Sequence, residues 1–214
     1  MDVSDKLTEC CAISNKTGEI NYVFPLYLLT QDGREPNLHE KFLQALRAVM
    51  DREPTPEEVL AYIYAVLHAP SYRQRYAPFL RYDYPRVPLP ASAEQFVRLA
   101  SLGQHLIELH LLRCLSLRES PVGFPVSGSN RVERGYPRYR DGAVWINASQ
   151  HFTGVAQAVW AMRIGGYQVC EKWLKDRRGR ALSNREIETY RRLVYALSQT
   201  LELVQVVDAA LEAS

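Results

Sequence analysis

Three capping boxes constrain the fold of this chain more than any other feature of its sequence. In a capping box, a Ser or Thr at the N-cap and a Glu or Gln three residues later satisfy each other's backbone N–H groups at the start of a helix. The boxes are Thr55-Pro56-Glu57-Glu58, Ser92-Ala93-Glu94-Gln95 and Ser183-Asn184-Arg185-Glu186. Apolar residues follow the boxes at three- and four-residue steps, which is the period of one helix face. The sequence therefore predicts helices over residues 56–68, 92–117 and 184–210.

The remaining segments predict shorter elements. Towards the N-terminus, we expect extended structure over 10–29 with Pro25 at an edge or a bulge, a loop over 31–37 and a helix over 38–50 capped by Asn37. In the middle of the chain, we expect at most a short helix over 71–80 and an extended segment over the proline-rich 82–91. Further on, we expect a hairpin with strands near 131–139 and 143–147 around Asp141-Gly142, and short helices over 155–162 and 167–175. Short β segments thus alternate with long α segments. This order predicts an α+β fold that is predominantly helical, with a small antiparallel β-sheet or hairpins.

The chain length suits one domain over residues 1–214. We expect four parts within it: a β-rich start at 10–30, a helical scaffold at 38–118, a β-hairpin region at 120–150 and a helical C-terminal part at 155–212.

The four cysteines do not form a framework for disulfides or zinc. Cys10 and Cys11 are adjacent, Cys114 and Cys170 are isolated in helical patterns, and no CxxC pair occurs. We expect reduced, mostly buried thiols, as in a cytosolic protein. The N-terminus is polar and the longest apolar run, 22–29, is too short to span a bilayer, so we expect a cytoplasmic chain without a membrane partner.

Sequence signatures of catalysis are absent. The chain contains no GxxxxGK[ST], GxGxxG, GxSxG or HExxH motif, and no N-P-P-[YF] tetrapeptide of the kind that clasps a flipped adenine. His110 and Cys114 have the i, i+4 spacing of metal ligands, but no second pair accompanies them, so a core role is favoured. Glu171 and Asp176 lie among basic residues, which predicts local ion pairs. We expect no catalytic residues, no metal site and no cofactor.

Positive charge is concentrated in three short segments, although the chain carries only +2 overall. Residues 70–86 hold four arginines against one aspartate, a net +3. Residues 131–140 hold four arginines against one glutamate, again +3, and residues 172–180 hold five basic residues against one aspartate, a net +4. If these segments meet in the folded chain, they present a local positive field to an anion; if they do not, they are solvated surfaces.

The composition of these segments suits a nucleic acid. Arg and Lys neutralise phosphates, and Arg and Asn can make bidentate contacts with base edges. The segment 175–180, KDRRGR, follows a helix and precedes another helix N-terminus, where backbone N–H groups favour anions. Tyrosines 72, 76, 82 and 84 lie among arginines and could stack on bases, but the four-residue spacing of Tyr72 and Tyr76 equally suits a buried helix stripe.

Three long stretches resemble one family. They are SNKTGEINYVFPLYL, YIYAVLHAPSYRQRYAPFLRYDYPRVPLP and IGGYQVCEKWLKDRRGRALSNREIETYRRLVYALSQT. The sequences of these stretches resemble the C-terminal specificity region of Type ISP restriction–modification enzymes and related adenine-methylating restriction enzymes. The resemblance covers about residues 10–208 and is weakest at 119–140.

In that family, a single polypeptide combines nuclease, helicase-like motor, N6-adenine methyltransferase and target-recognition parts, and the C-terminal part reads the DNA site. The motifs of the upstream parts are missing here, so we expect an excised domain or the product of a split or degenerate gene. The resemblance therefore implies site recognition without methyl transfer. The isolated chain should neither bind S-adenosylmethionine nor methylate DNA.

These observations predict a DNA target-recognition domain, non-catalytic alone, that supplies specificity to an adenine N6-methyltransferase/nuclease. Its expected partners are double-stranded DNA and the methyltransferase/nuclease portion of the parent enzyme, on which helices 56–68 and 92–117 would dock. The alternative is a helical protein-interaction module, or a truncated remnant without DNA binding. Basic segments gathered on one face would favour the first reading, and scattered segments the second.

The candidate DNA-binding residues come from the three basic segments. They are Asn130, Arg131, Arg134, Arg138, Arg140, Lys175, Arg177, Arg178, Arg180, Arg73 and Arg75. Among them, Asn130 and Arg134 lie on the expected reading hairpin and should influence sequence preference, whereas the pair at 177–178 should contact phosphates.

Overall fold

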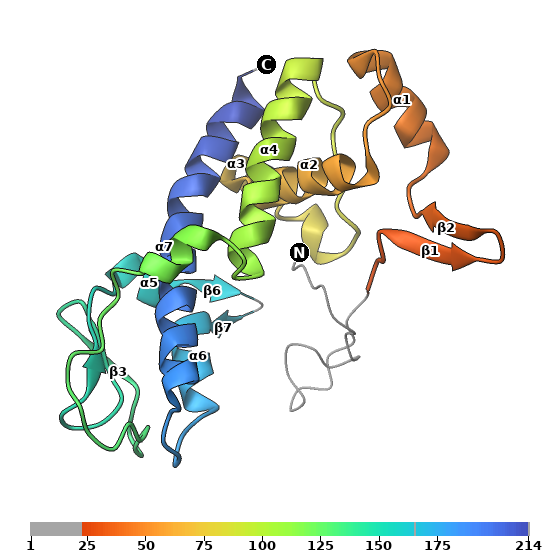
Figure 1. Ribbon diagram of the computed structural model, residues 1–214. Helices are drawn as coiled ribbons and strands as arrows, with labels where there is room; N and C mark the ends of the chain where they lie inside the picture. The colour runs from red at the N-terminus through yellow and green to blue at the C-terminus, as the bar shows by residue number, and fades with distance from the viewer. Residues whose placement is uncertain (1–22, 165, 214) are drawn as a thin grey trace. The chain divides into compact units, whose positions relative to one another are not determined.

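The computed structural model describes residues 23–164 and 166–213, and their contacts divide them into two compact units. The first unit holds the residues up to Leu111 together with those from Glu202 on, and the second holds Leu112–Leu201. Each unit has its own cluster of buried side chains. Helices dominate the first unit, and the described strands of both units form small antiparallel sheets (Figure 1). The predicted α+β class is confirmed.

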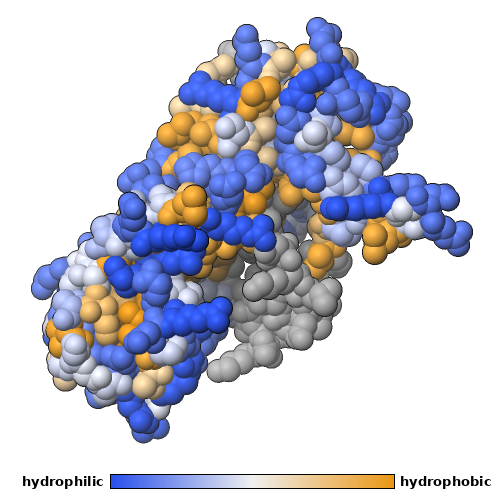
Figure 2. Space-filling view, viewed as in Figure 1, coloured by the Kyte–Doolittle hydropathy of each residue, from blue (hydrophilic) through white to orange (hydrophobic). Residues whose placement is uncertain are grey.

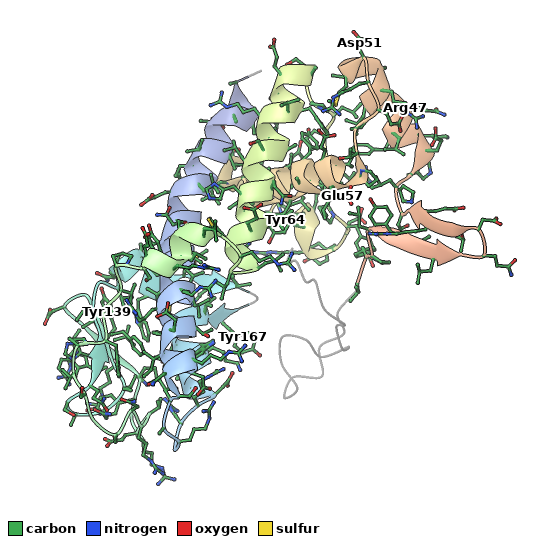
Figure 3. The ribbon with its side chains drawn as sticks, viewed as in Figure 1. Arg47, Asp51, Glu57, Tyr64, Tyr139 and Tyr167 are labelled. Atoms are coloured by element: carbon green, nitrogen blue, oxygen red, sulfur yellow. The ribbon has the colours of Figure 1, made fainter. Side chains whose placement is uncertain are left out.

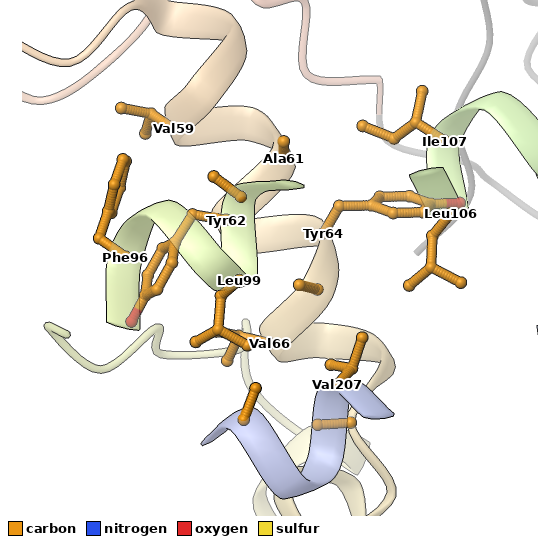
Figure 4. Close-up of a cluster of buried hydrophobic side chains, with 14 of the residues drawn as sticks. Val59, Ala61, Tyr62, Tyr64, Val66, Phe96, Leu99, Leu106, Ile107 and Val207 are labelled. Carbon is orange, nitrogen blue, oxygen red and sulfur yellow. The ribbon is translucent and has the colours of Figure 1, made fainter. Parts of the chain in front are cut away.

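The first unit is built around two packed helices. Its elements are β1 (Tyr27–Thr30), β2 (Gly33–Pro36), α1 (Glu40–Met50), α2 (Pro56–His68), α3 (Pro70–Arg75), the 3-10 turn η1 (Phe79–Arg81), α4 (Ala93–His110) and the last part of α7 (Asn184–Glu212). Tyr62 of α2 stacks on Phe96 of α4 with ring centroids 5.1 Å apart, and Val207 of α7 joins the same buried cluster (Figure 4). The β1–β2 hairpin is exposed, with hydrophobic surface on one side (Figure 2).

The second unit combines a three-stranded sheet with short helices. Its elements are η2 (Leu115–Glu119), β3 (Arg138–Arg140), β4 (Ala143–Trp145), β5 (His151–Phe152), α5 (Gln157–Ala161), β6 (Arg163–Ile164), β7 (Tyr167–Gln168), α6 (Val169–Lys175) and the first part of α7. The sheet order is β3-β4-β5. Val144 and Phe152 pair across it and are fully buried, and Phe152 packs on Tyr190 of α7. One face of the sheet therefore covers the core of this unit.

The three capping boxes behave as local sequence chemistry requires, with one variation. Thr55 and Glu58 cap each other at the start of α2, and Ser183 and Glu186 do the same at the start of α7. The Ser92 hydroxyl accepts from the backbone N–H of Gln95, but the Gln95 amide oxygen accepts from Ala91 instead of closing the box. All three predicted helix starts are confirmed.

The C-terminal end predicted for the helix at 92–117 is wrong. Helix α4 ends at His110, because Leu112 adopts a left-handed φ of 54° that cannot continue a right-handed helix. Residues 115–119 form η2 instead. The spacing of apolar residues beyond His110 suggested that the helix continues. Leu117 is indeed buried, but it belongs to η2 and not to α4.

The N-terminal expectations need correction. Residues 10–22 lie outside the described residues. From Tyr27 on, the chain forms the β1–β2 hairpin, so 31–37 is not a loop; Gly33, with φ 130°, permits the reversal. Asn37 does not cap a helix, because its side-chain amide donates to the Pro25 carbonyl at 2.9 Å. The cap of α1 is His39, and Pro25 precedes β1 without belonging to it.

The hairpin at 138–145 confirms one prediction and corrects another. Asp141 and Gly142 both have left-handed φ, which a tight two-residue hairpin turn requires. The expected strand at 131–139 begins only at Arg138, because residues 131 and 132 pair with the segment at 178–181. The helices expected at 155–162 and 167–175 are shorter, at 157–161 and 169–175, and the small β6–β7 hairpin between them was not predicted.

Candidate nucleic-acid interface

Two of the three basic segments are joined by backbone hydrogen bonds in the second unit. The Val132 N–H donates to the Arg180 carbonyl at 3.1 Å, and the Gly179 N–H donates to the Val132 carbonyl at 2.8 Å. The Leu182 N–H donates to the Asn130 carbonyl at 2.8 Å. Segments 131–140 and 172–180, more than 30 residues apart in sequence, therefore lie side by side. The third segment, 70–86, belongs to the first unit.

Five arginines of the joined segments have no ion pair with an acidic residue in the part of the chain that the structure describes. We call them the unpaired arginines: Arg131, Arg134, Arg138, Arg140 and Arg178. All five are exposed. The Nε–H of Arg138 donates to the Gly135 carbonyl at 3.0 Å, and that of Arg178 to the Tyr136 carbonyl at 2.5 Å. These bonds orient two guanidinium groups through Nε, which leaves their terminal nitrogens to serve a ligand.

The other basic candidates in these segments have internal partners. Lys175 pairs with Glu171 at 2.7 Å. Arg177 lies 3.5 Å from the centroid of the Trp173 ring, donates to the Trp173 carbonyl and pairs with Glu186. Arg180 makes two hydrogen bonds to the same Glu186 carboxylate, at 2.6 and 3.0 Å.

The ion pairs that the sequence predicted for the two acidic residues of 171–176 are confirmed. Glu171 pairs with Lys175, and Asp176 pairs with Lys172 at 2.5 Å. Much of the positive charge of 172–180 is therefore neutralised locally, and the exposed surface of the unit alternates hydrophilic and hydrophobic areas (Figure 2).

Asn130 holds the loop in place from the inside. Its backbone has a left-handed φ of 53°. Its N–H donates to the Gln150 amide oxygen, and its side-chain oxygen accepts from the Gln150 amide nitrogen, both at 2.7 Å. The hydrogen-bonding oxygen of Asn130 is thus engaged with a buried glutamine, and its observed role is to position the loop that carries Arg131 and Arg134.

Sequence reasoning missed Gln150 and Asn147, which organise this loop. Gln150 is fully buried, and its amide also donates to the Val126 carbonyl and accepts from the Asn147 side chain. Asn147 donates to the Arg131 carbonyl and accepts from the backbone N–H groups of residues 149 and 150. An Asn directly after an alternating strand is a signal for such a turn; a buried Gln has no comparable signal.

The candidates in the first unit are Arg73 and Arg75 of α3. Both are exposed, and neither has an ion pair with a described acid. Nearby, Tyr72 is buried, packs on Tyr76 and donates from its hydroxyl to the Arg86 carbonyl, so Tyr72 belongs to the core stripe. Tyrosines 82 and 84 are instead 90% and 59% exposed.

The proposed metal spacing of His110 and Cys114 is not realised on one helix, because α4 ends at His110. The His110 Nδ1 lies 2.6 Å from the hydroxyl of Tyr64, which is labelled in Figure 3. Over residues 23–164 and 166–213, no group of three or more His, Cys, Asp or Glu side chains could hold a metal ion. Burial raises the pKa of the Cys170 thiol to about 12, as expected for a buried thiol.

None of the helices in the described ranges is both long and apolar enough to cross a bilayer.

Glu186 should make the stability of the second unit sensitive to acid. Hydrogen bonds from Arg180, and then from the backbone of Ser183, hold the pKa of this carboxyl well below its ordinary value. A carboxyl with a lowered folded-state pKa stabilises the fold above its unfolded pKa of about 4.3, and this contribution is lost as the pH falls further. We expect Glu186→Gln to lower the melting temperature at pH 7 and to have a progressively smaller effect as the pH falls below about 4, as measured by thermal unfolding at a series of pH values.

A matched control for this experiment is Glu133→Gln, which removes an exposed carboxylate of the same unit that has no ion pair with a described residue. Its melting temperature should follow the wild-type pH profile. Equal pH profiles for Glu186→Gln and Glu133→Gln would contradict the role given to Glu186.

A family model decides the identity of the chain. The model of the Type ISP C-terminal specificity domain matches residues 3–206. The chain belongs to this family. The resemblance inferred from the sequence is thereby confirmed, and the joined basic segments lie within the matched region of the specificity domain. No curated protein matches the chain significantly.

Solved structures share the fold of this specificity domain. The DrdV–DNA complex, solved by cryo-electron microscopy, matches 86% of this chain and 21% of its own with a TM-score of 0.64 and 23% identity. A nuclease-deletion mutant of the Type ISP enzyme LlaGI with a DNA substrate mimic matches 85% of this chain and 17% of its own (TM-score 0.57, 21% identity). The match to the ATP-dependent Type ISP enzyme LlaBIII bound to DNA covers 86% of this chain and 13% of the LlaBIII chain (TM-score 0.58, 16% identity). This chain therefore spans about a fifth or less of each of these proteins.

Proposed function

We propose that this specificity domain recognises a DNA target on behalf of a larger restriction–modification enzyme with an adenine N6-methyltransferase and nuclease. The observation that carries the proposal is the set of five unpaired arginines on two chain segments, 131–140 and 172–180, that backbone hydrogen bonds hold together. Exposed guanidinium groups without acidic partners attract phosphates and raise the local concentration of a polyanion. The family assignment and the DNA present in the three structural neighbours support the same reading.

The candidate residues take different parts in this proposal. We assign phosphate contacts to Arg131, Arg140 and Arg178, and base contacts to residues on the loop and hairpin between 134 and 138. Lys175, Arg177 and Arg180 add to the positive field, but their own partners limit direct contact. Arg73 and Arg75 supply a separate basic surface on the first unit.

We propose that both units work as one specificity domain, since the family match runs through both. By itself the domain performs no catalysis, and the methyltransferase/nuclease portion of a parent enzyme is its protein partner. Restriction of DNA takes place in the cytoplasm, where we place the protein.

Binding of duplex DNA by the chain should depend steeply on salt, and Arg131→Ala/Arg178→Ala should flatten that dependence. Each lost phosphate contact lowers the slope of log K against log [salt] by about 0.9, so two contacts lower it by about 2. At 0.15 M salt, the same loss corresponds to roughly 30-fold weaker binding. Fluorescence anisotropy of a labelled duplex of about 30 base pairs, titrated at salt concentrations between about 0.05 and about 0.3 M, measures both the affinity and its salt slope.

A charge-matched control is Arg98→Ala/Arg118→Ala, which removes two exposed arginines outside the joined segments. Its slope should stay near the wild-type value. If the Arg131/Arg178 variant keeps the wild-type affinity and slope while remaining folded, DNA binding at this surface is refuted and a helical protein-interaction module becomes the better reading.

A further inference from the structure

The outer face of the β3–β4–β5 sheet carries a row of three side chains that lie outside the core cluster of the unit. Strand residues alternate between the two faces of a sheet. The inner row is Tyr139 (labelled in Figure 3), Val144 and Phe152, which join the core cluster. The Tyr139 hydroxyl donates to the Val155 carbonyl, and the ring stacks on Trp160. The outer row, in the same register, is Arg138, Trp145 and His151.

The two rings of the outer row stack on each other. The Trp145 and His151 centroids are 4.1 Å apart with an interplanar angle of 29°. A stacked cross-strand pair stabilises a sheet, and any aromatic residue at position 151 would serve that purpose. His151 instead brings a polar ring whose Nδ1 is buried without a hydrogen-bond partner among the described residues. Such an atom costs free energy in the free chain, so stability does not account for a histidine here.

Arg138 is held at the end of this row in a fixed orientation. Its Nε–H is anchored on the Gly135 carbonyl, and its guanidinium carbon lies 5.0 Å from the centroid of the Tyr136 ring. The side chain is exposed, and its terminal nitrogens can form the two parallel donors that match O6 and N7 of guanine. Two residues further on, exposed Arg140 lies on the same face of β3, where it can contact the adjacent phosphate.

We infer that the outer face of this sheet reads base edges in the major groove of duplex DNA, with Arg138 specifying a guanine and the other ring nitrogen of His151, Nε2, contacting a second base of the site. Trp145 spaces the two groups and keeps the imidazole in plane. Strands of β-sheets are among the elements that read the major groove. Arg138 and His151 lie on β3 and β5, on either side of β4, so they are about two strand spacings, or roughly 10 Å, apart and can address two bases of one site that are about three steps apart. The inference rests on the proposed DNA recognition and names its specificity-determining residues.

The test is selection from a randomised duplex pool by the full chain, followed by competition binding with the enriched sequence and its single-base variants. Three variants are compared: Arg138→Ala, His151→Phe, which keeps the stack and removes the ring nitrogens, and the control Arg118→Ala. Wild type and control should enrich the same motif. Arg138→Ala should lose roughly 10- to 100-fold of the preference for one guanine, and His151→Phe should lose preference at a second position of the motif with an unchanged or higher melting temperature.

The outcomes separate the inference from the proposed function. If wild type binds duplex DNA with a salt slope but enriches no sequence, or if both variants weaken all sequences equally, the base-reading role of this face is overturned while DNA binding stands. If wild type shows no salt-dependent binding, the proposed function fails and the inference fails with it.

Discussion

Replacing Gly103 with valine should prevent the first unit from folding. A Cβ atom at this position would lie 1.9 Å from the carbonyl oxygen of Ala61 and 2.7 Å from its carbonyl carbon. These are backbone atoms of α2, so no side-chain rotation relieves the clash, and α2 and α4 would have to separate. Separation would open the core where Tyr62 stacks on Phe96 (Figure 4). Overpacking typically costs about 1–3 kcal/mol where neighbours can adjust, and we expect more here.

The direction of the Gly103 effect is opposite to helix propensity. In an exposed helix interior, replacing Gly with Ala gains about 1 kcal/mol. At position 103 the clash of the added Cβ with the α2 backbone outweighs this gain. We therefore expect Gly103→Ala to destabilise the unit and Gly103→Val to abolish its cooperative unfolding transition, as measured by urea unfolding followed by circular dichroism. The matched control is Ser101→Val, which places the same side chain on the exposed face of α4 and should cost less than about 1 kcal/mol. A wild-type midpoint for Gly103→Ala would show that the two helices do not approach as closely as described.

Gln150→Ala should destabilise the second unit by about 3–5 kcal/mol. The buried amide satisfies four groups, and each buried polar group that loses its partner costs about 1–3 kcal/mol, although water entering the space left behind recovers part of the loss. The groups released are the Asn130 N–H and side-chain oxygen, the Val126 carbonyl and the Asn147 amide. The loop that carries Arg131 and Arg134 would lose its anchor, so DNA binding should weaken together with stability.

The control for this glutamine is Gln157→Ala, at the exposed start of α5 in the same unit. It should shift the unfolding midpoint by less than about 0.5 kcal/mol. Chemical unfolding followed by tryptophan fluorescence compares the two variants, since Trp145, Trp160 and Trp173 all lie in this unit. Equal stability of the two variants would mean that the hydrogen-bond network of Gln150 does not hold the loop.

The most reliable sequence inferences concerned features set by neighbours along the chain. The starts of α2, α4 and α7 were predicted correctly, because an N-cap side chain and a residue three positions later form their hydrogen bonds whatever lies elsewhere. The Asp141-Gly142 turn was correct for the same reason, since it depends on the φ values that those two residues tolerate. The family was also legible from three long stretches of sequence and is confirmed by the match over 3–206.

Predictions that treated a segment in isolation did less well. Asn37 is a residue type that often caps a helix, but its side-chain amide donates a hydrogen bond to the Pro25 carbonyl, 12 residues away. The apolar stripe beyond His110 suggested a longer helix, yet the left-handed turn at Leu112 takes Leu117 into another element. In both cases a longer-range contact or a change of chain direction overrode a local preference.

The sequence by itself determined that this chain is an α+β specificity domain with three strongly capped helices and positive charge in three short segments. Only the tertiary structure decided which of those charges remain available. Glu186 caps α7 and also takes Arg177 and Arg180, whereas Arg131, Arg134 and Arg178 meet no described acid. Charge is a property of each residue, but its availability depends on partners that folding brings from elsewhere in the chain. For this reason the sequence could list the basic residues, and only the folded chain separates those that stabilise it from those left to bind a ligand.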